Sequence, residues 1–319
     1  MKKILFSLSL ILSFNAHAQT SGSCAPLDEN DQPIGSCQWS LNGDTLTISG
    51  TGPMKDYSTL TQNGFATTDA PFNDRNSDKD TGSLYQIKNI VIENGITNIG
   101  NNFMAGALHV ENLQMADSVK SIGEQSFYLS AWEVDHPTLS LSKNLESVAD
   151  YGLYGWQTEI ELPNTLKSLG LASLSGLQNT SIIIPDSMES ISSSAFEGYS
   201  ASKLTSLVLP QKLIDENGLD INALCNSKIS TLYCPQGKET FCADYVNSAK
   251  TQSSCYGGSV AEDLSYETYR KEGDRYILGN QPYKSIADFY NNKPIRRIYT
   301  IEEANFVAGD KNRVSITYR

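Results

Sequence analysis

The chain has 319 residues, with 24 Lys and Arg against 36 Asp and Glu, and a formal net charge of −12 at pH 7. The charge is uneven, since residues 19–258 hold 12 basic and 27 acidic side chains, whereas residues 259–319 hold ten and nine. Proteins that bind phosphate backbones carry a basic stripe, so this composition argues against nucleic acid as a partner.

The first 18 residues have the layout of a secretory signal peptide. Two lysines form a charged n-region, an apolar run spans residues 4–14, and Ala16-His17-Ala18 is an A-x-A cleavage site. We therefore expect Sec-type export with cleavage after Ala18. No second long apolar stretch follows, so no transmembrane segment is predicted in the mature chain.

Residues 19–86 are expected to form an N-terminal β-hairpin capping module. The string WSLNGDTLTISG, residues 39–50, alternates apolar and polar residues on both sides of Asn42-Gly43. That pattern is typical of two strands joined by a two-residue turn. Because an unpaired end of a repeat stack invites aggregation, we predict that this hairpin covers the first repeat.

Residues 87–257 are dominated by one recurring pattern. In each copy an apolar–x–apolar pair is followed by an apolar–x–x–apolar pair, a polar turn, an aromatic or aliphatic residue and, in most copies, Gly. The second apolar residue falls at positions 92, 115, 141, 162, 184 and 209, in steps of 21–26 residues. Such a period is typical of a leucine-rich-repeat solenoid, whose stacked strands bury a shared core. The sequence therefore predicts a mostly β fold with short helical turns, built as a right-handed solenoid with a parallel sheet.

Two strings in this region, VIENGITNIGNNFMAG (residues 91–106) and IIIPDSMESISSSAFEG (residues 182–198), resemble BspA-type leucine-rich repeats. Pro163, Pro185 and Pro210 occupy the matching strand ends, and residues 37–57 resemble the module that precedes the repeats in that family. Repeat three lacks the proline, repeats three and four carry Leu in place of Phe, and the pattern degrades after Leu213. The resemblance implies a secreted or surface bacterial protein with a role in adhesion.

The six cysteines are an even number, which fits an oxidising compartment and disulfides. Six cysteines allow 15 connectivities. After export two histidines remain, His109 and His136, and neither lies near a cysteine, so disulfides are favoured over a metal site and no metal or cofactor is predicted. Nearness in sequence favours Cys24–Cys37 and Cys234–Cys242, which leaves Cys225 with Cys255.

Residues 258–319 are expected to form a separate small α+β module that docks on the solenoid or on a partner. Residues 266–283 predict a Tyr-rich hairpin that turns at Glu272–Asp274, and residues 296–300 and 313–319 predict strands. Ser285-x-x-Asp288 predicts the start of a short helix. Thr300-x-x-Glu303 is a capping box for a second helix that ends at Gly309.

Candidate binding residues follow from their place in the repeats. Strand residues that point away from the core form a row that a solenoid displays as an extended surface; they are Val91, Gln114, Ser140, Glu161, Ile183 and Val208. Aromatic residues in or after the turns can stack on sugars or anchor a protein interface; they are Tyr128, Trp132, Tyr154, Trp156 and Tyr199. For Trp132 and Trp156, packing between the coils is an equally good interpretation.

Patterns that imitate catalytic or metal sites are weak in this chain. Residues 74–80 have the spacing of a calcium loop, but Lys79 and Tyr85 stand where the loop needs Gly and Glu, which favours a solvated acidic turn. Asp135-His136 is an isolated pair, and no G-x-S-x-G elbow occurs. The sequence therefore predicts no catalytic residues and no enzyme.

Together these features predict an exported, non-catalytic recognition or adhesion surface for extracellular or cell-surface proteins or glycans. The protein is expected at the cell surface or in the medium, with the periplasm as the alternative. Two other functions stay open: a periplasmic scaffold or assembly factor, and an enzyme or inhibitor whose site lies in residues 258–319.

Overall fold

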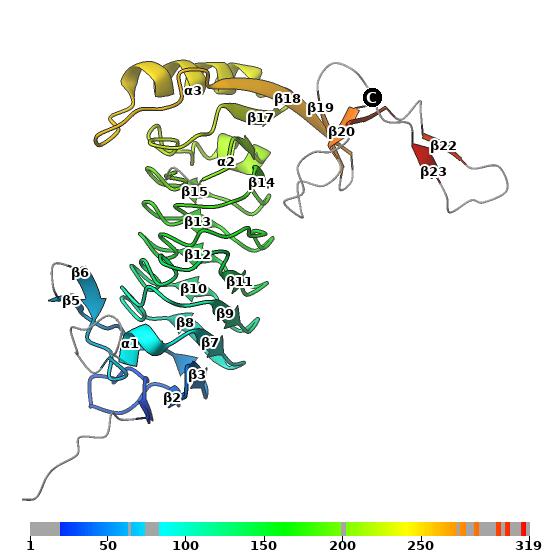
Figure 1. The fold of residues 1–319 in the computed structure, drawn as a ribbon. Helices are drawn as coiled ribbons and strands as arrows, with labels where there is room; N and C mark the ends of the chain where they lie inside the picture. Colours follow the sequence, from blue (N-terminus) through cyan, green and yellow to red (C-terminus); the bar gives the residue numbers. More distant parts are fainter. Residues whose placement is uncertain are drawn as a thin grey trace, which may run out of the picture.

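The computed structural model describes residues 20–62, 65–73, 83–198, 202–272 and 275–278, together with four short strands nearer the C-terminus. The expected signal peptide, the calcium-like string at residues 74–80 and Tyr199 lie outside these ranges. The described backbone stacks in successive coils, with the N-terminal elements at one end and helix α3 (Glu239–Gln252) at the other (Figure 1). The structure confirms a mostly β fold with parallel sheets, while the handedness stays a prediction.

The N-terminal region forms an antiparallel sheet that joins the first repeat. That sheet contains β1 (Ser21–Ser23), β2 (Gln38–Asn42) and β3 (Thr45–Ser49). The region also contains β4 (Gly52–Pro53) in a second sheet, the separate pair of β5 (Thr59–Gln62) and β6 (Phe65–Thr68), and α1 (Ser83–Gln86). The β2–β3 hairpin turns at Gly43, whose φ of 61° suits glycine. β3 then pairs in parallel with β7 (Asn89–Ile92), so the hairpin covers the edge of the first repeat strand.

Each repeat contributes one segment to a parallel arrangement that we call the strand wall, at the right of Figure 1. It comprises β7, β9 (Asn112–Met115), β11 (Thr138–Ser140), residues 160–162, β14 (Ser181–Ile183), β16 (Ser206–Val208) and β17 (Thr231–Pro235). In β7, Ile90 and Ile92 are buried and Val91 faces the opposite side, as the alternation of a strand requires. The pairing runs from β7 to β11 and again from β14 to β17.

A second wall continues every coil with a shorter strand. Its strands are β8 (Ile96–Ile99), β10 (Ser121–Ile122), β12 (Ser147–Val148), β13 (Ser168–Leu169) and β15 (Ser190–Ile191). Each strand ends on a buried Ile, Val or Leu, which is the last residue of the apolar–x–x–apolar pair. The parallel pairing is unbroken from β8 to β15.

A third side of the coil, the turn wall, consists of residues 100–106, 123–131, 149–156, 170–176 and 192–198. Successive turns are joined by backbone hydrogen bonds, such as Phe127 N to Gly152 O at 3.0 Å and Leu129 N to Tyr154 O at 2.9 Å. The inward aromatic residues of the turns meet edge to face along the axis. Ring centroids lie 5.8 Å apart for Phe103 and Phe127, and 6.4 Å apart for Phe127 and Trp156. These contacts order the centre of the stack.

Charged residues alternate at one position of successive coils, just before the second wall. Lys120, Glu146, Lys167, Glu189 and Lys212 follow one another along the axis. Glu146 lies 2.6 Å from Lys167 and 3.6 Å from Lys120, and Glu189 lies 2.7 Å from Lys212. The hydrogen bond from Lys167, together with its charge, lowers the pKa of Glu146. Ion pairs on the surface therefore also help to fix the alignment of neighbouring coils.

The C-terminal part of the chain adds two helices and a hairpin to the last coils. α2 (Gln211–Asp215) follows β16, and α3, which the sequence reading missed, follows β17. The predicted Tyr-rich hairpin is confirmed as β18 (Ser265–Glu272) and β19 (Arg275–Leu278). β18 pairs in parallel with β17, so the hairpin continues the sheet of the repeats.

Four short strands follow, β20 (Lys284–Ile286), β21 (Ile298–Thr300), β22 (Ala304–Phe306) and β23 (Val314–Ile316). β21 and β23 confirm the predicted strands. The helix expected from Thr300 to Gly309 is wrong, because β22 occupies residues 304–306. The helix expected to open at Ser285 lies almost entirely outside the described residues. β20 pairs with β19, and β22 pairs with β23. Sheet pairing therefore prevails over the local capping signals.

The three predicted disulfides are confirmed: Cys24–Cys37, Cys225–Cys255 and Cys234–Cys242. Cys234 and Cys242 join β17 to α3, which fixes the helix on the last coil. Within the described residues, every helix is too short or too polar to cross a bilayer.

Candidate ligand-binding surfaces

Four of the six predicted strand residues are displayed on the outer side of the strand wall. Gln114 and Ser140 are exposed and aligned in register, and Val91 is partly buried one strand before them. Glu161 is exposed on the segment that follows β11. The row is therefore short and polar, and it covers the N-terminal half of the repeats.

The other two strand residues, Ile183 and Val208, were wrongly expected to be accessible. They point outward as the alternation requires, but only 6% and 1% of their surfaces are exposed. Tyr269 and Tyr276 of the β18–β19 hairpin pack over them. The Tyr269 hydroxyl donates to the Leu209 carbonyl at 2.8 Å, which anchors the hairpin. A distant segment thus covers the apolar end of the row.

Trp156 is also wrong as a binding residue, because its side chain is 0% exposed. Its Nε1 donates to the Phe127 carbonyl at 3.3 Å, so packing inside the stack is the correct interpretation. Trp132 differs, with 37% of its surface exposed. It lies against the next turn, where Gly155 has a φ of 90° and a Cβ would come within 3.1 Å of Trp132 Cε3.

Two predicted tyrosines, Tyr128 and Tyr154, come together with a third, Tyr151, on the outside of the turn wall. We call these three residues the tyrosine cluster. The rings of Tyr128 and Tyr154 are stacked, with centroids 5.0 Å apart. Tyr151 meets Tyr128 edge-on at 6.0 Å and Tyr154 at 5.7 Å. All three side chains are partly exposed.

The backbone of Tyr151 has a φ of 57°, a conformation that Asn adopts more readily than an aromatic residue. Equivalent positions in the other turns also have positive φ, and they hold small or polar residues: Asn102, Gln125, Ala172 and Ser194. The conformation thus belongs to the repeat, whereas the aromatic side chain is particular to this turn. The ring at position 151 contributes to the surface cluster and not to the geometry of the turn.

The tyrosine cluster lies in a negative electrostatic field. Burial raises the pKa of Tyr154, and the nearby Glu197 carboxylate raises it further. The same two causes act in the same order on the pKa of Tyr128 and of Tyr151. The phenols therefore stay protonated and can donate hydrogen bonds. Partly exposed rings beside a carboxylate suit a sugar, or the basic and aromatic side chains of a protein.

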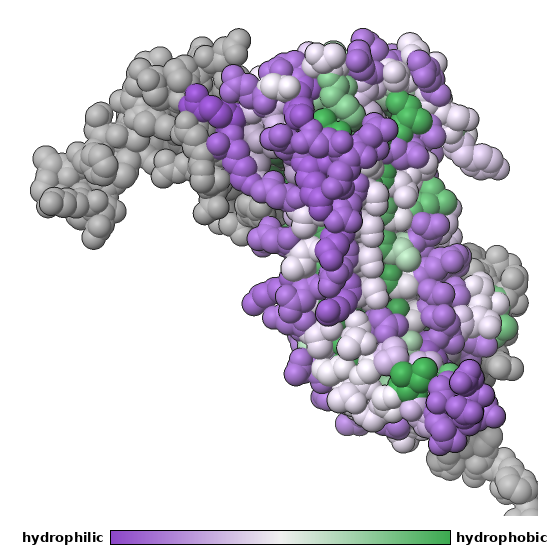
Figure 2. All heavy atoms as spheres, turned by 180° about the vertical axis from the view of Figure 1, so that it is seen from behind, coloured by the Kyte–Doolittle hydropathy of each residue, from purple (hydrophilic) through white to green (hydrophobic). Residues whose placement is uncertain are grey.

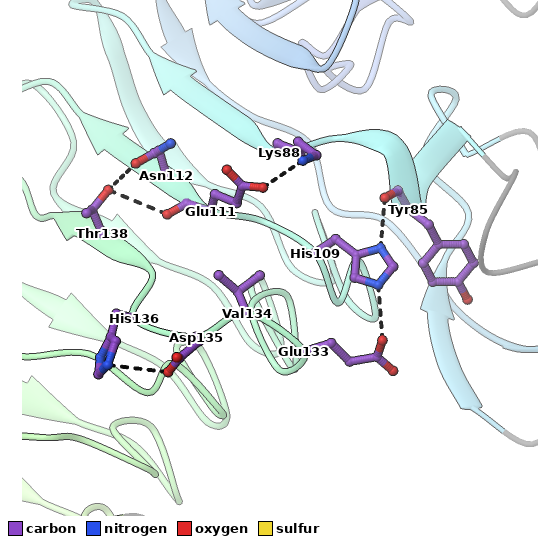
Figure 3. Close-up of a pocket in the computed structure, with 10 residues that line it drawn as sticks. All are labelled: Tyr85, Lys88, His109, Glu111, Asn112, Glu133, Val134, Asp135, His136 and Thr138. Carbon is purple, nitrogen blue, oxygen red and sulfur yellow. Dashed lines mark hydrogen bonds and ion pairs between the residues drawn. The ribbon is translucent and has the colours of Figure 1, made fainter.

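A polar hollow of about 630 Å³ lies near the N-terminal end of the strand wall (Figure 3). Both histidines of the described chain line it. The His109 Nδ1 lies 3.0 Å from the Tyr85 carbonyl, to which it donates, and its Nε2 lies 3.1 Å from Glu133. His136 lies 3.4 Å from Asp135, which is exposed.

The remaining polar groups of this hollow are also engaged with one another. Lys88 pairs with Glu111 at 2.7 Å, and the Thr138 hydroxyl donates to the Asn112 side chain. In the described part of the chain, no group of His, Cys, Asp and Glu is arranged to hold a metal ion. The hollow is thus a cross-linked junction between α1 and the first three coils, as Figure 3 shows.

The face opposite to that of Figure 1 is largely hydrophilic, with small hydrophobic patches between polar surfaces (Figure 2). Few large hydrophobic side chains are exposed in the described chain: Leu27 and Ile34 on the two arms of one N-terminal loop, and Trp132 and Tyr256 elsewhere. So few exposed residues are ordinary on a protein surface, and they do not mark an interface by themselves.

The repeats match a known family. The sequence profile of the BspA type leucine rich repeat region matches residues 82–157 and 133–250, with six copies, and these stretches together cover more than half of the chain. The chain belongs to the BspA-type leucine-rich repeat family. The resemblance in the repeat strings is thereby confirmed.

Solved structures of bacterial leucine-rich repeat proteins are similar to this BspA-type chain at low identity. A leucine-rich repeat protein from Eubacterium ventriosum is 20% identical with a TM-score of 0.44, over 61% of this chain and 53% of its own. One from Bacteroides ovatus is 18% identical with a TM-score of 0.39, over 65% and 59%. A leucine rich cell surface protein from Faecalibacterium prausnitzii is 16% identical with a TM-score of 0.30, over 65% and 72%. The chain thus spans little more than half the length of the first, and no curated protein matches it.

Within this BspA-type solenoid, Tyr151 is the surface residue that the sequence reading missed. The repeat pattern gives no aromatic signal at its position, which is filled differently in every turn. A signal was nevertheless available, since Tyr151 and Tyr154 are three residues apart in one short turn next to two glycines. That spacing places both rings on one side of the turn.

Proposed function

We propose that this chain is an exported recognition protein that binds an extracellular or cell-surface protein or glycan through the tyrosine cluster. The observation that carries the proposal is the partly exposed set of three rings on the rigid turn wall. Tyr and Trp supply large contact areas with few rotatable bonds, and they are common among the residues that dominate binding energy.

The scaffold supports a binding role for these rings. Hydrogen bonds join the turns of successive coils, and Tyr154 O accepts from Leu129 N at 2.9 Å. A side chain on such a backbone loses little freedom when a ligand binds, so less of the contact energy is spent on ordering. Leucine-rich repeat proteins of this kind act in general as non-catalytic binding scaffolds, and we propose the same for this chain.

Export is supported by the signal-like N-terminus and by the three disulfides, which persist in oxidising compartments. Protease treatment of intact producing cells, with lysed cells and culture medium blotted alongside, tests the location. Digestion on whole cells, or protein in the medium, is expected. Protection until lysis would contradict surface display and favour the alternative of a periplasmic scaffold.

Binding is tested by applying residues 19–319 to an array of glycans and an array of extracellular proteins, and then titrating the strongest hit. The variant with Tyr128→Ala and Tyr154→Ala removes the stacked pair. We expect the dissociation constant to rise about 30-fold, since a dominant contact contributes ~2 kcal/mol. Tyr256→Ala, which removes a tyrosine that is 98% exposed outside the cluster, is the matched control and should bind like wild type.

A double variant that binds like wild type would exclude the tyrosine cluster as the recognition site. A double variant that no longer folds is recognised by its far-ultraviolet circular dichroism. In that event Tyr128→Phe and Tyr154→Phe replace it, because they keep the rings and remove only the hydroxyl donors. The glycan and protein arrays separate the two classes of ligand.

A further inference from the structure

The strand wall is interrupted between its third and fourth segments. The first sheet of the wall ends at β11, and the next begins at β14, so residues 160–162 lie between two sheets without belonging to either. Within the described chain, no backbone hydrogen bond joins Leu139 or Leu141 to Glu161. The second wall stays continuous at the same level, where β12 pairs with β13.

The direction of the backbone groups identifies which of them lack a partner. Thr138 N donates to Glu111 O at 2.8 Å, so the backbone groups of Thr138 and Ser140 face the preceding coil. Those of Leu139 and Leu141 must then face residues 160–162, because peptide groups alternate along a strand.

The fourth segment is held from its other side by one asparagine. Ile160 N donates to Asn179 Oδ1 at 3.0 Å, and Asn179 Nδ2 donates to Ile160 O at 2.8 Å. The backbone of Ile160 therefore faces the following coil, and that of Glu161 faces Leu139 and Leu141. A regular ladder would join Glu161 N to Leu139 O and Leu141 N to Glu161 O. Neither bond forms within the described chain.

A hollow of about 470 Å³ occupies this interruption, and we call it the slot. The partly buried Leu139 and Leu141 give it an apolar floor. Ser140, Glu161 and Asn164 are exposed at its rim. The slot thus combines apolar surface with backbone donors and acceptors that have no partner among the described residues, and peptide groups of that kind favour a ligand or water.

We propose that the slot binds a neutral saccharide ring. Hydroxyl groups both donate and accept hydrogen bonds, which matches the Leu141 N–H, the Leu139 C=O and both backbone groups of Glu161. The C–H face of a sugar can lie on the leucine floor. This site is distinct from the tyrosine cluster and does not depend on it.

Two other ligand classes fit the slot less well. An extended peptide would have to enter as a further strand and so separate the coils by roughly another 4.8 Å, the spacing of neighbouring strands, whereas a saccharide at the mouth need only direct its hydroxyl groups into the slot. The unbroken β12–β13 pairing opposes such an opening. An anion would be repelled by the Glu161 carboxylate, and the positive charge of Lys143 at the rim only neutralises that negative charge.

The proposal is tested on residues 19–319 with glucose, galactose, mannose, N-acetylglucosamine and their disaccharides, by saturation-transfer NMR followed by titration. At least one saccharide should bind saturably to the wild type. Ser140→Ile narrows the mouth of the slot and should weaken that binding by ~10-fold or more. Thr97→Ile, at an exposed strand position of the second wall outside the slot, is the control and should bind like wild type.

Amide hydrogen exchange tests the interruption itself. Leu141 N–H should exchange faster than Met115 N–H, its counterpart in the preceding coil, and it should slow when the saccharide is bound. The proposal is overturned if no saccharide binds the wild type, if Ser140→Ile binds unchanged, or if Leu141 is as protected as Met115 without ligand. None of these results would bear on the tyrosine cluster, whose ligand is tested separately.

Discussion

Replacing Trp156 with Ala is expected to lower the free energy of unfolding strongly, because Trp156 packs inside the solenoid and does not contact a ligand. The indole is 0% exposed and meets Phe127 edge to face, with ring centroids 6.4 Å apart. Its Nε1 also donates to the Phe127 carbonyl at 3.3 Å. Trp156 therefore links two coils at the centre of the aromatic stack.

The magnitude follows from the groups that are lost. Truncating a buried Trp to Ala costs about 3–5 kcal/mol through lost burial and the cavity left behind. Trp156→Phe keeps a ring but removes the indole hydrogen bond to the Phe127 carbonyl, which still accepts from Ser130 N at 3.2 Å, so this loss costs about 0.5–1.5 kcal/mol. Trp132→Ala removes a side chain that is 37% exposed and should cost about 1 kcal/mol or less.

Equilibrium unfolding in urea, followed by far-ultraviolet circular dichroism, measures the three variants against wild type. We expect the urea concentration at the unfolding midpoint to fall most for Trp156→Ala, less for Trp156→Phe and least for Trp132→Ala. A Trp156→Ala variant that unfolds at the wild-type midpoint but binds ligand weakly would refute the reasoning, because Trp156 would then be a contact residue.

Three further changes test other parts of the structure. Replacing Cys225 and Cys255 by Ala opens a link with a sequence separation of 30 and should lower stability by about 3–4 kcal/mol, seen as a lower melting temperature. The pKa of Glu146 is held below its ordinary value of 4.5, so its ion pairs stabilise the fold above that pH and weaken as the pH falls through the lowered pKa. The free energy of unfolding in urea should therefore fall less steeply below about pH 5 for Glu146→Gln than for wild type. Tyr269→Ala should uncover Ile183 and increase the binding of a hydrophobic dye.

Each of these has a contrary result. An unchanged melting temperature would mean that the link between Cys225 and Cys255 does not constrain the last coil. If stability depends on pH equally in wild type and Glu146→Gln, the ion pairs of Glu146 do not help to hold successive coils in alignment. Unchanged dye binding by Tyr269→Ala would mean that the hairpin is not what covers Ile183.

The repeats could be predicted from the sequence because apolar residues recur at every second position of each strand, and this alternation shows which side chains are buried. Ile90 and Ile92 are apolar, with one residue between them, and a strand that buries one face requires that spacing. Disulfide pairing was also predictable from nearness along the chain. In both cases the interacting residues are close in sequence or are repeated at a constant interval.

The errors concern contacts between distant segments. Ile183 and Val208 were placed on the correct side of their strands, but the cover supplied by Tyr269 and Tyr276 comes from a hairpin far along the chain. Trp156 follows Gly155, where a φ of 90° changes the direction of the chain, and the residue pattern does not show on which side the next side chain falls. At the interruption, residue 160 is held by Asn179, a polar residue that no periodic pattern marks.

The location of the ligand is the central claim, and oxidative footprinting of the complex tests it most directly. Residues 19–319 are labelled alone and when saturated with the strongest ligand from the arrays, and the labelling of each tyrosine is then compared. The account predicts lower labelling of Tyr128, Tyr151 and Tyr154 in the complex, with Tyr256 unchanged. Unchanged labelling of all three tyrosines in a saturated complex would contradict it.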